Sequence, residues 1–202
     1  MQKIILSVFL SVLVFSSRGQ SVIAQWNFNT PLPPDNNQLT GSTVASMGSG
    51  SVRLIGGSIP SGTNPFNAGT DNDYFTNGID NTAWNIRSFP AQGTLSKTAG
   101  IQFACSTIGY QNIIFRFDEK HSSSAPNTTV VQYNPDTTNA AGWVDVQVNK
   151  LADTTYSETY LTHIVDLSSI TAVNNRPRLG IRIVAAFDPD SSLRYIATYY
   201  KT

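Results

Sequence analysis

The sequence predicts an all-β protein, an antiparallel β-sandwich of jelly-roll character. Apolar residues come in short runs that alternate with polar residues, as in strands that bury one face, and they do not repeat at helical spacing. Stretches rich in Gly, Pro, Asn, Asp and Ser separate these runs, and such residues form turns. Roughly seven to ten strands without intervening helices favour two packed sheets.

The first part of the chain contains the weaker strand signals. VIAQWNFN (22–29) predicts a strand, which the Pro-rich TPLPPDNN ends because proline donates no hydrogen bond to a sheet. A short strand follows around Val52 to Ile55. Residues 59–82 form a long polar excursion, and AWNIRSFP (83–90) is a strand or a bulged segment.

The second part contains the clearer signals. Its predicted strands are AGIQFACST, NIIFRFDEKH, TTVVQYN, WVDVQV (143–148), LTHIVDL (161–167), LGIRIVAAFD (179–188) and RYIATYY (194–200). The connection 166–177 is expected to contain one helical turn at 168–172. No repeat of fixed period is present, which argues against a propeller or a solenoid.

The first 20 residues have the features of an export signal. Lys3 supplies a positive start, Ile4 to Phe15 are apolar, and small residues follow. The apolar run is shorter than the roughly 20 residues that span a bilayer. We expect 1–20 to be a signal peptide and 21–202 to be one β-sandwich domain, secreted or held at the cell surface, without a transmembrane segment.

The net charge and the single cysteine argue against two kinds of function, nucleic-acid binding and catalysis by a thiol. The 13 basic and 13 acidic residues cancel, so we expect no nucleic-acid partner. The single cysteine, Cys105, excludes an internal disulfide. Alternation places Cys105 on one strand face with Ile101 and Phe103, which is typical of a small buried hydrophobic residue rather than a nucleophile.

The densest group of reactive side chains lies in NIIFRFDEKHSSS. Alternation places Phe115, Phe117, Glu119 and His121 on one strand face, and the charged Arg116, Asp118 and Lys120 on the other. The second face is typical of a solvated sheet surface. Because no GxSxG motif or triad spacing is present, we interpret DEKHSSS as a strand end and a loop. On this interpretation, replacing His121 should leave the fold largely intact.

Exposed aromatic rings and polar neighbours are candidates for ligand binding. Flat rings stack on the apolar faces of sugars, and Trp84 and Trp143 are flanked by polar loop residues. The other candidate ligand-binding residues are Arg116, Asp118 and His121. For each aromatic ring, packing in the core is the alternative.

GTDNDYFTNGID (69–80) is a candidate calcium loop. Asp71, Asp73 and Asp80 supply carboxylates among glycines that let the backbone bend, and calcium prefers oxygen ligands. The spacing differs from that of an EF-hand. The alternative is an ordinary turn, since Asn, Asp and Gly are common turn residues. No other cofactor is indicated.

Three segments occur in an order that resembles a known kind of domain. These are VIAQWNFN, then NTAWNIRSFPAQGTLSKTAGIQFACSTIGYQNIIFRFDEKHSSSAPNTTVVQY, then NNRPRLGIRIVAAFDP. Together they resemble a β-sandwich domain of unknown function found in secreted and surface-attached bacterial proteins. The resemblance implies a fold and an extracellular location, and it implies no site residues.

The last residues depart from that domain. Its members usually finish with a Gly-rich turn and a further aromatic strand before a sorting tail, whereas this sequence finishes with RYIATYYKT. We expect either that the final strand is missing or that RYIATYY replaces it. A missing strand would expose a sheet edge.

These observations favour a non-catalytic extracellular module that binds carbohydrate or another component of the cell surface, such as a surface protein. The first alternative is a secreted hydrolase of polysaccharide or phosphodiester. The absence of a motif with triad, metal-ligand or phosphate-binding spacing argues against it. The second alternative is a structural spacer.

Calcium removal tests the candidate loop. If Asp71, Asp73 and Asp80 bind calcium, a chelator should lower the melting temperature, because a ligand that binds only the folded state stabilises it. Thermal unfolding followed by circular dichroism, with and without chelator, measures this. An unchanged melting temperature would remove the site.

Overall fold

The structure, a computed structural model, describes residues 19–30, 39–70, 82–91, 94–122, 125–150 and 160–187. The regular structure of the described residues is almost entirely β-strand, and every pair of neighbouring strands is antiparallel. Its helical content is one 3-10 turn, η1 (Thr171–Val173). Within it, no helix has the length and apolar character needed to cross a membrane. The predicted all-β class is confirmed at this level.

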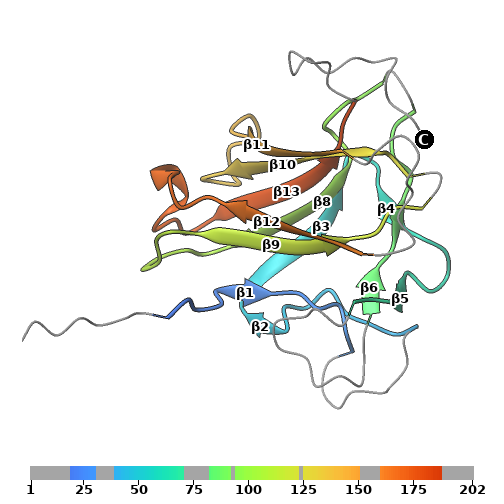
Figure 1. The fold of residues 1–202 in the computed structure, drawn as a ribbon, viewed down its shortest axis with the longest axis horizontal. Helices are drawn as coiled ribbons and strands as arrows, with labels where there is room; N and C mark the ends of the chain where they lie inside the picture. The colour runs from blue at the N-terminus through green and yellow to red at the C-terminus, as the bar shows by residue number, and fades with distance from the viewer. Residues whose placement is uncertain are drawn as a thin grey trace, which may run out of the picture.

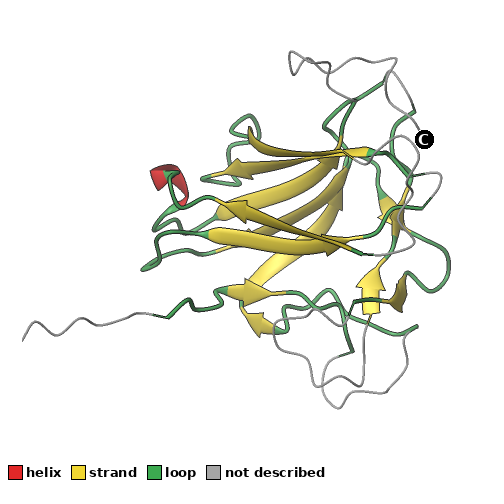
Figure 2. Cartoon of the chain, in the orientation of Figure 1, coloured by secondary structure: helices red, strands yellow, loops and turns green. Residues whose placement is uncertain are grey.

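The largest sheet has five strands in the order β11-β10-β13-β8-β3 (Figures 1 and 2). Their bounds are β3 (Gly50–Ile55), β8 (Gly100–Cys105), β10 (Thr128–Asn134), β11 (Val144–Lys150) and β13 (Leu179–Ala185). Each overlaps a run predicted from alternation, because successive side chains of a strand point to opposite faces of the sheet. The central strands β10 and β13 are buried at most positions on both faces. The register between β10 and β11 shifts between Val131 and Gln132, as in a β-bulge.

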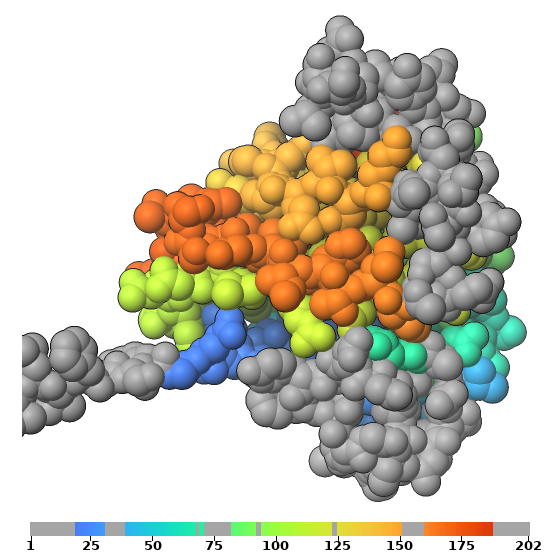
Figure 3. Space-filling view, in the orientation of Figure 1, coloured from blue at the N-terminus to red at the C-terminus, as the bar shows by residue number. Residues whose placement is uncertain are grey.

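A second layer consists of β9 (Ile114–Glu119) and β12 (Leu161–Asp166), which pair along their full lengths. The pair lies over the five-stranded sheet, and its residues form much of the surface seen in Figure 3. The rings of Phe103 in β8 and Phe115 in β9 join the two layers, with centroids 5.7 Å apart. The strand end predicted in DEKHSSS is present, since β9 ends at Glu119.

The space between the layers is filled by one buried apolar cluster, here called the core cluster. Its fully buried members are Ile113, Val131, Val165, Leu167, Val173, Leu179 and Ile181. They come from both layers and from the connection that follows β12, so the cluster attaches that connection to the sheets. Leu167 is 0% exposed, and its amide donates to the Ile113 carbonyl at 3.0 Å.

Three short strand pairs extend the molecule on the side of β3 (Figure 1). They are β1 (Ala24–Gln25) with β2 (Met47–Gly48), β4 (Ile59–Pro60) with β7 (Ile86–Arg87), and β5 (Phe66–Ala68) with β6 (Thr82–Trp84). The ring of Trp26 connects this region to the main sheet, with its centroid 5.2 Å from that of Phe103.

Local backbone conformation changes three predicted elements. The strand predicted over 22–29 is reduced to Ala24–Gln25, and Phe28 has a φ of 59°, which extended chain does not adopt. The segment 83–90 contains the last two residues of β6 and all of β7. The helical turn predicted at 168–172 is the 3-10 turn at Thr171–Val173.

Several expectations fall on residues outside the described ranges. The apolar part of the signal peptide and the strand predicted at 194–200 are among them. The signal peptide at 1–20, the single domain at 21–202 and the replaced or missing final strand therefore stay predictions.

Leu167→Ala tests the core cluster. We expect a loss of roughly 2–5 kcal/mol in the free energy of unfolding, because a buried leucine that is truncated leaves a cavity. Ile164→Ala is the control, since Ile164 is 62% exposed on β12, and surface changes usually stay within about 0.5 kcal/mol. Urea denaturation measures both. Equal losses would contradict the assignment of inner and outer faces.

Candidate functional site

Polar side chains gather at two places in the described structure. One is on the face of the five-stranded sheet opposite the core cluster, here called the outer face, where the polar residues adjoin a second, smaller apolar cluster that contains the buried Val130 and Val184. The other is one end of the space between the layers, where Glu119 of β9 meets His163 of β12. In both places, the pairing of strands brings together polar residues that are distant in the sequence. The first contains arginines and glutamines, and the second contains a carboxylate and histidines.

A polar row crosses the outer face from edge to edge. It contains, from β3 to β11, Arg53, Gln102, Arg182, Gln132 and Asp145. Antiparallel register places each of these residues directly opposite the next. Their neighbours along the strands, such as Phe103 and Ile181, face the core instead. We call these five residues the outer row.

Hydrogen bonds hold most of the outer row in place. Arg53 Nη2 donates to Gln102 Oε1 at 3.3 Å, and Arg182 Nε donates to Gln132 Oε1 at 2.5 Å. Gln132 Nε2 then donates to Asp145 Oδ1 at 2.5 Å. Lys97, from the segment before β8, pairs with the other carboxylate oxygen of Asp145. The two glutamines are nearly buried beneath these contacts.

Trp143, a predicted ligand-binding residue, lies beside the outer row. The Arg182 guanidinium carbon is 4.2 Å from the centre of its ring, a cation–π contact. The indole occupies the space above Gly180, where a Cβ would lie 2.8 Å from an atom of the Trp143 ring. The structure therefore places Trp143 on the outer face, half-buried and next to a charged group.

Trp84, the other predicted tryptophan, lies in a different environment. Its ring stacks on Phe66, with centroids 6.4 Å apart, and contacts Phe28 at 5.8 Å. It belongs to the small aromatic group around β5 and β6. The structure does not bring Trp84 together with Trp143 in one site.

Arg116 and Asp118 are on the outward face of β9, as alternation predicts. Arg116 is exposed, whereas Asp118 is half-buried beside Tyr160, whose pKa is raised by its burial and by the Asp118 charge. Opposite them in β12 are Ile164 and Thr162. His121 lies on the inward side, so it is not part of the same surface as Arg116 and Asp118.

Glu119 lies between two histidines, with its side chain 15% exposed. Its Oε1 lies 2.9 Å from His163 Nε2, and its Oε2 lies 3.3 Å from His121 Nε2. Thr129 Oγ1 also donates to Oε1, at 3.3 Å, and Asn149 Nδ2 donates to Thr129 Oγ1 at 3.4 Å. The ring of His163 stacks on Phe117, which places this polar cluster at the end of the core.

The geometry around His121 fits a charged imidazolium. Its Nδ1 lies 2.7 Å from the Pro126 carbonyl oxygen, an acceptor, so Nδ1 carries a hydrogen. A neutral ring would then direct a lone pair at Glu119, whereas a protonated ring donates to both partners. Burial acts to lower the pKa of His121, but the hydrogen bond and charge of Glu119 raise it above 6.5.

Glu119 is held as a carboxylate. Burial by itself raises its pKa, but hydrogen bonds from His121 and His163, together with their charges, outweigh burial and lower the pKa to about 2. Such a group is a poor proton donor near neutral pH. It is suited to holding a histidine in a fixed orientation.

A cavity of about 150 Å³ adjoins this cluster. Its lining is Glu119, Asn149, Lys150, Leu161 and His163. This lining contains no hydroxyl or thiol that could act as a nucleophile. Within the described ranges, no three His, Cys, Asp or Glu side chains form a group able to hold a metal ion. The candidate calcium ligands Asp71, Asp73 and Asp80 lie outside those ranges.

Cys105 ends β8 on its inward side and is half-buried, so the expected complete burial is not reached. Its strand partners are Gly50 and Leu179. Burial raises the pKa of its thiol, which keeps the sulfur protonated and unreactive.

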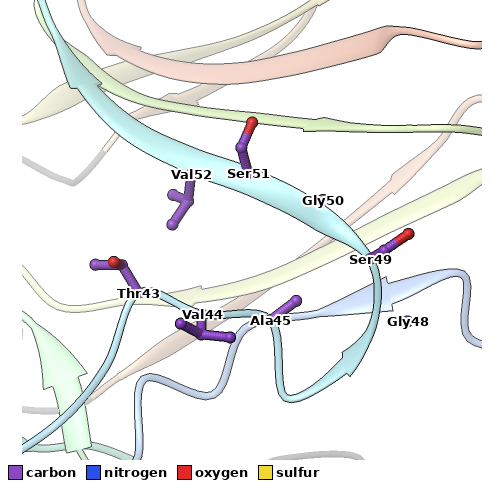
Figure 4. Close-up of a pocket in the computed structure, with 8 residues that line it drawn as sticks. All are labelled: Thr43, Val44, Ala45, Gly48, Ser49, Gly50, Ser51 and Val52. Atoms are coloured by element: carbon purple, nitrogen blue, oxygen red, sulfur yellow. The ribbon is translucent and has the colours of Figure 1, made fainter.

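A wide hollow of about 390 Å³ lies beside the edge strand β3, between residues 43–45 and 48–52. Thr43 and Val52 point into the space between the two segments, whereas Ser51 points to the other side of the strand (Figure 4). Only small residues line it: Thr43, Val44, Ala45, Gly48, Ser49, Gly50, Ser51 and Val52. Without a charged or aromatic side chain, this lining offers little to orient a ligand.

No family model, curated protein or solved structure matches the chain. The resemblance to secreted bacterial β-sandwich domains therefore stays a prediction.

Sequence reasoning missed the pairing of Glu119 with His163. A signal was present, since alternation in LTHIVDL places His163 on the same side as the buried Val165. Sequence reasoning also assigned His121 to a strand end and loop in which replacement should leave the fold largely intact. The structure places His121 at 8% exposure with two polar contacts, and we now expect replacement to destabilise the fold.

Glu119→Gln tests the buried cluster. The change keeps the side-chain volume and removes the charge, so we expect a loss of about 3 kcal/mol in the free energy of unfolding. The contribution of Glu119 is present above pH 4.5 and is lost as the pH falls toward 2. That of His121 is present below pH 6.5 and is lost as the pH rises through its raised native pKa.

Urea denaturation across the pH range measures this. Wild-type stability from this cluster should be greatest between pH 4.5 and 6.5, and the variant should lack that maximum. Asp166→Asn, on the neighbouring strand β12, removes an exposed carboxylate and should leave the decline above pH 6.5 unchanged. A Glu119→Gln profile identical to wild type would contradict the ion pair.

Proposed function

We propose that this protein is an extracellular, non-catalytic module that binds a glycan or another component of the cell surface through its outer face. The proposal includes a β-sandwich of jelly-roll character and export by residues 1–20. The described strands by themselves show an all-β chain with antiparallel pairing; the jelly-roll character and the export are parts of the proposal.

The layering supports the sandwich. The β9–β12 pair faces the five-stranded sheet across the core cluster, and both layers contribute to it. Strands far apart in the sequence are neighbours, since β8 lies between β3 and β13. Such long-range neighbours are typical of Greek-key and jelly-roll connections.

The features of the first 20 residues support export, as does the resemblance to domains of secreted bacterial proteins. The low share of charged residues, 13%, is in keeping with such domains. An exported protein of this kind meets polysaccharides and other surface components before it meets metabolites of the cell interior.

The observation that carries the binding proposal is the placement of Arg182 against Trp143. Arg182 has its Nε bonded to Gln132 and its flat face on the indole, so its side chain is already ordered. Its two Nη amines make no hydrogen bond to a described residue. An ordered donor beside an aromatic ring suits a polar ligand with apolar faces, because little conformational entropy is lost on binding.

A hydrolase is the alternative, and the Glu119–His163 contact beside a 150 Å³ cavity is the feature that favours it. A carboxylate that orients a histidine is part of many hydrolytic sites. Here the described cavity lining contains no hydroxyl or thiol nucleophile and no second carboxylate to pair with Glu119, as a glycosidase would need, and the low pKa of Glu119 makes it a poor general acid. The outer face therefore supports binding better than the cavity supports hydrolysis.

Binding of the purified protein to an immobilised panel of neutral and acidic polysaccharides tests the proposal. We expect at least one glycan to bind, and Trp143→Ala and Arg182→Ala each to weaken that binding by roughly 1–3 kcal/mol, about 5- to 150-fold. Biolayer interferometry measures the affinities.

Circular dichroism and the melting temperature establish that each variant is folded. Arg87→Ala is the control, because Arg87 is an exposed arginine in the separate β4–β7 pair and should not affect binding. Glycan binding that survives both outer-face changes would remove the outer face as the site. A folded protein that binds no glycan would leave a spacer or a protein-binding role.

A further inference from the structure

The outer row carries more positive charge than its own carboxylate balances. Arg53 and Arg182 both donate to neutral glutamine oxygens, not to carboxylates. Asp145, the acid of the row, is bonded to Lys97 and Gln132. Among the described residues, neither arginine of the row donates a hydrogen bond to a carboxylate. Cross-strand pairs of opposite charge are common in sheets. In this row, glutamines stand opposite the two arginines instead of acids.

We propose that the ligand of the outer face is an acidic polysaccharide, whose carboxylate or sulfate groups contact Arg182 and Arg53. This inference rests on the proposed function and names the ligand class for the same site. Both oxyanions share the chemistry that matters, a group of oxygens that accepts two parallel hydrogen bonds from a guanidinium.

Arg182 is the stronger of the two contacts. Its Nε is used by Gln132, and one face of the guanidinium packs on Trp143 at 4.2 Å, so the Nη end is the part left for a ligand. The side chain is half-buried, which reduces the screening of its charge by water. Arg53 is exposed and contributes less per contact.

The spacing of the two arginines requires a ligand longer than one sugar. Arg53 and Arg182 lie opposite Gln102 from either side, two strands apart, so their backbones are separated by about 9.6 Å. Both side chains lean in the same direction across the sheet, each toward the next strand, which preserves that separation. A chain that carries an anion on successive sugars can contact both.

Two pairs of probes isolate the anion from the sugar backbone. Polygalacturonate is compared with its methyl ester, which lacks the carboxylate charge, and dextran sulfate is compared with uncharged dextran. Galacturonic acid monomer and single-stranded DNA complete the panel. Each is titrated against wild type, Arg182→Gln, Arg182→Lys, Arg53→Gln and the control Arg87→Gln.

The expected result is binding of at least one charged polymer at least tenfold tighter than its uncharged partner, with the monomer weaker still. Arg182→Gln should weaken that binding at least tenfold, and Arg53→Gln severalfold. Arg182→Lys should not restore it, because an ammonium cannot form two parallel hydrogen bonds. Added salt should weaken binding in wild type and less so in Arg182→Gln.

Three results would overturn the inference. Equal binding of esterified and free polygalacturonate, or binding of dextran alone, would keep the proposed function and remove the acidic ligand. Tighter binding of single-stranded DNA than of every glycan would assign the arginines to phosphate. A folded protein that binds nothing in the panel would overturn both the inference and the glycan-binding part of the proposed function.

Discussion

The register of the five-stranded sheet is the constraint on which the rest of the structure depends. In β13, Leu179, Ile181 and Ile183 face the core cluster, whereas Gly180 and Arg182 face away from it. A slip of one residue would exchange the two sets, exposing isoleucines and burying a guanidinium. The same alternation therefore produces both the apolar core and the polar outer row, and neither can change without the other.

The strands could be predicted from the sequence because alternation is a local property. Glu119 was placed on the same face as Phe115 and Phe117 by that rule, and the structure confirms it. Its partner His163 could not be assigned, because β9 and β12 are distant in the sequence and only strand order brings them together. The outer row escaped prediction for the same reason, since its five residues come from five strands. Trp143 was selected from its polar neighbours alone, and its contact with Arg182 depends on the sheet.

The two polar regions differ in how many of their hydrogen-bonding groups already have partners within the protein. Between the layers, a carboxylate is taken out of water, and both of its oxygens receive partners from His121, His163 and Thr129. Such a satisfied group holds its surroundings in place and has little capacity left for a ligand. On the outer face, Arg182 is ordered by two contacts but keeps donors that no described residue uses. This difference is the physical reason for assigning binding to the outer face and a structural role to Glu119.

The most direct test of this division is amide NMR of the ¹⁵N-labelled protein titrated with an oligogalacturonate long enough to span the sheet. The account predicts saturable shifts in β3, β8, β13 and β10 centred on Gln102 and Arg182, with Glu119 and His163 unaffected. Shifts centred on Glu119, His163 and Lys150 would contradict it and would place the ligand in the cavity between the layers.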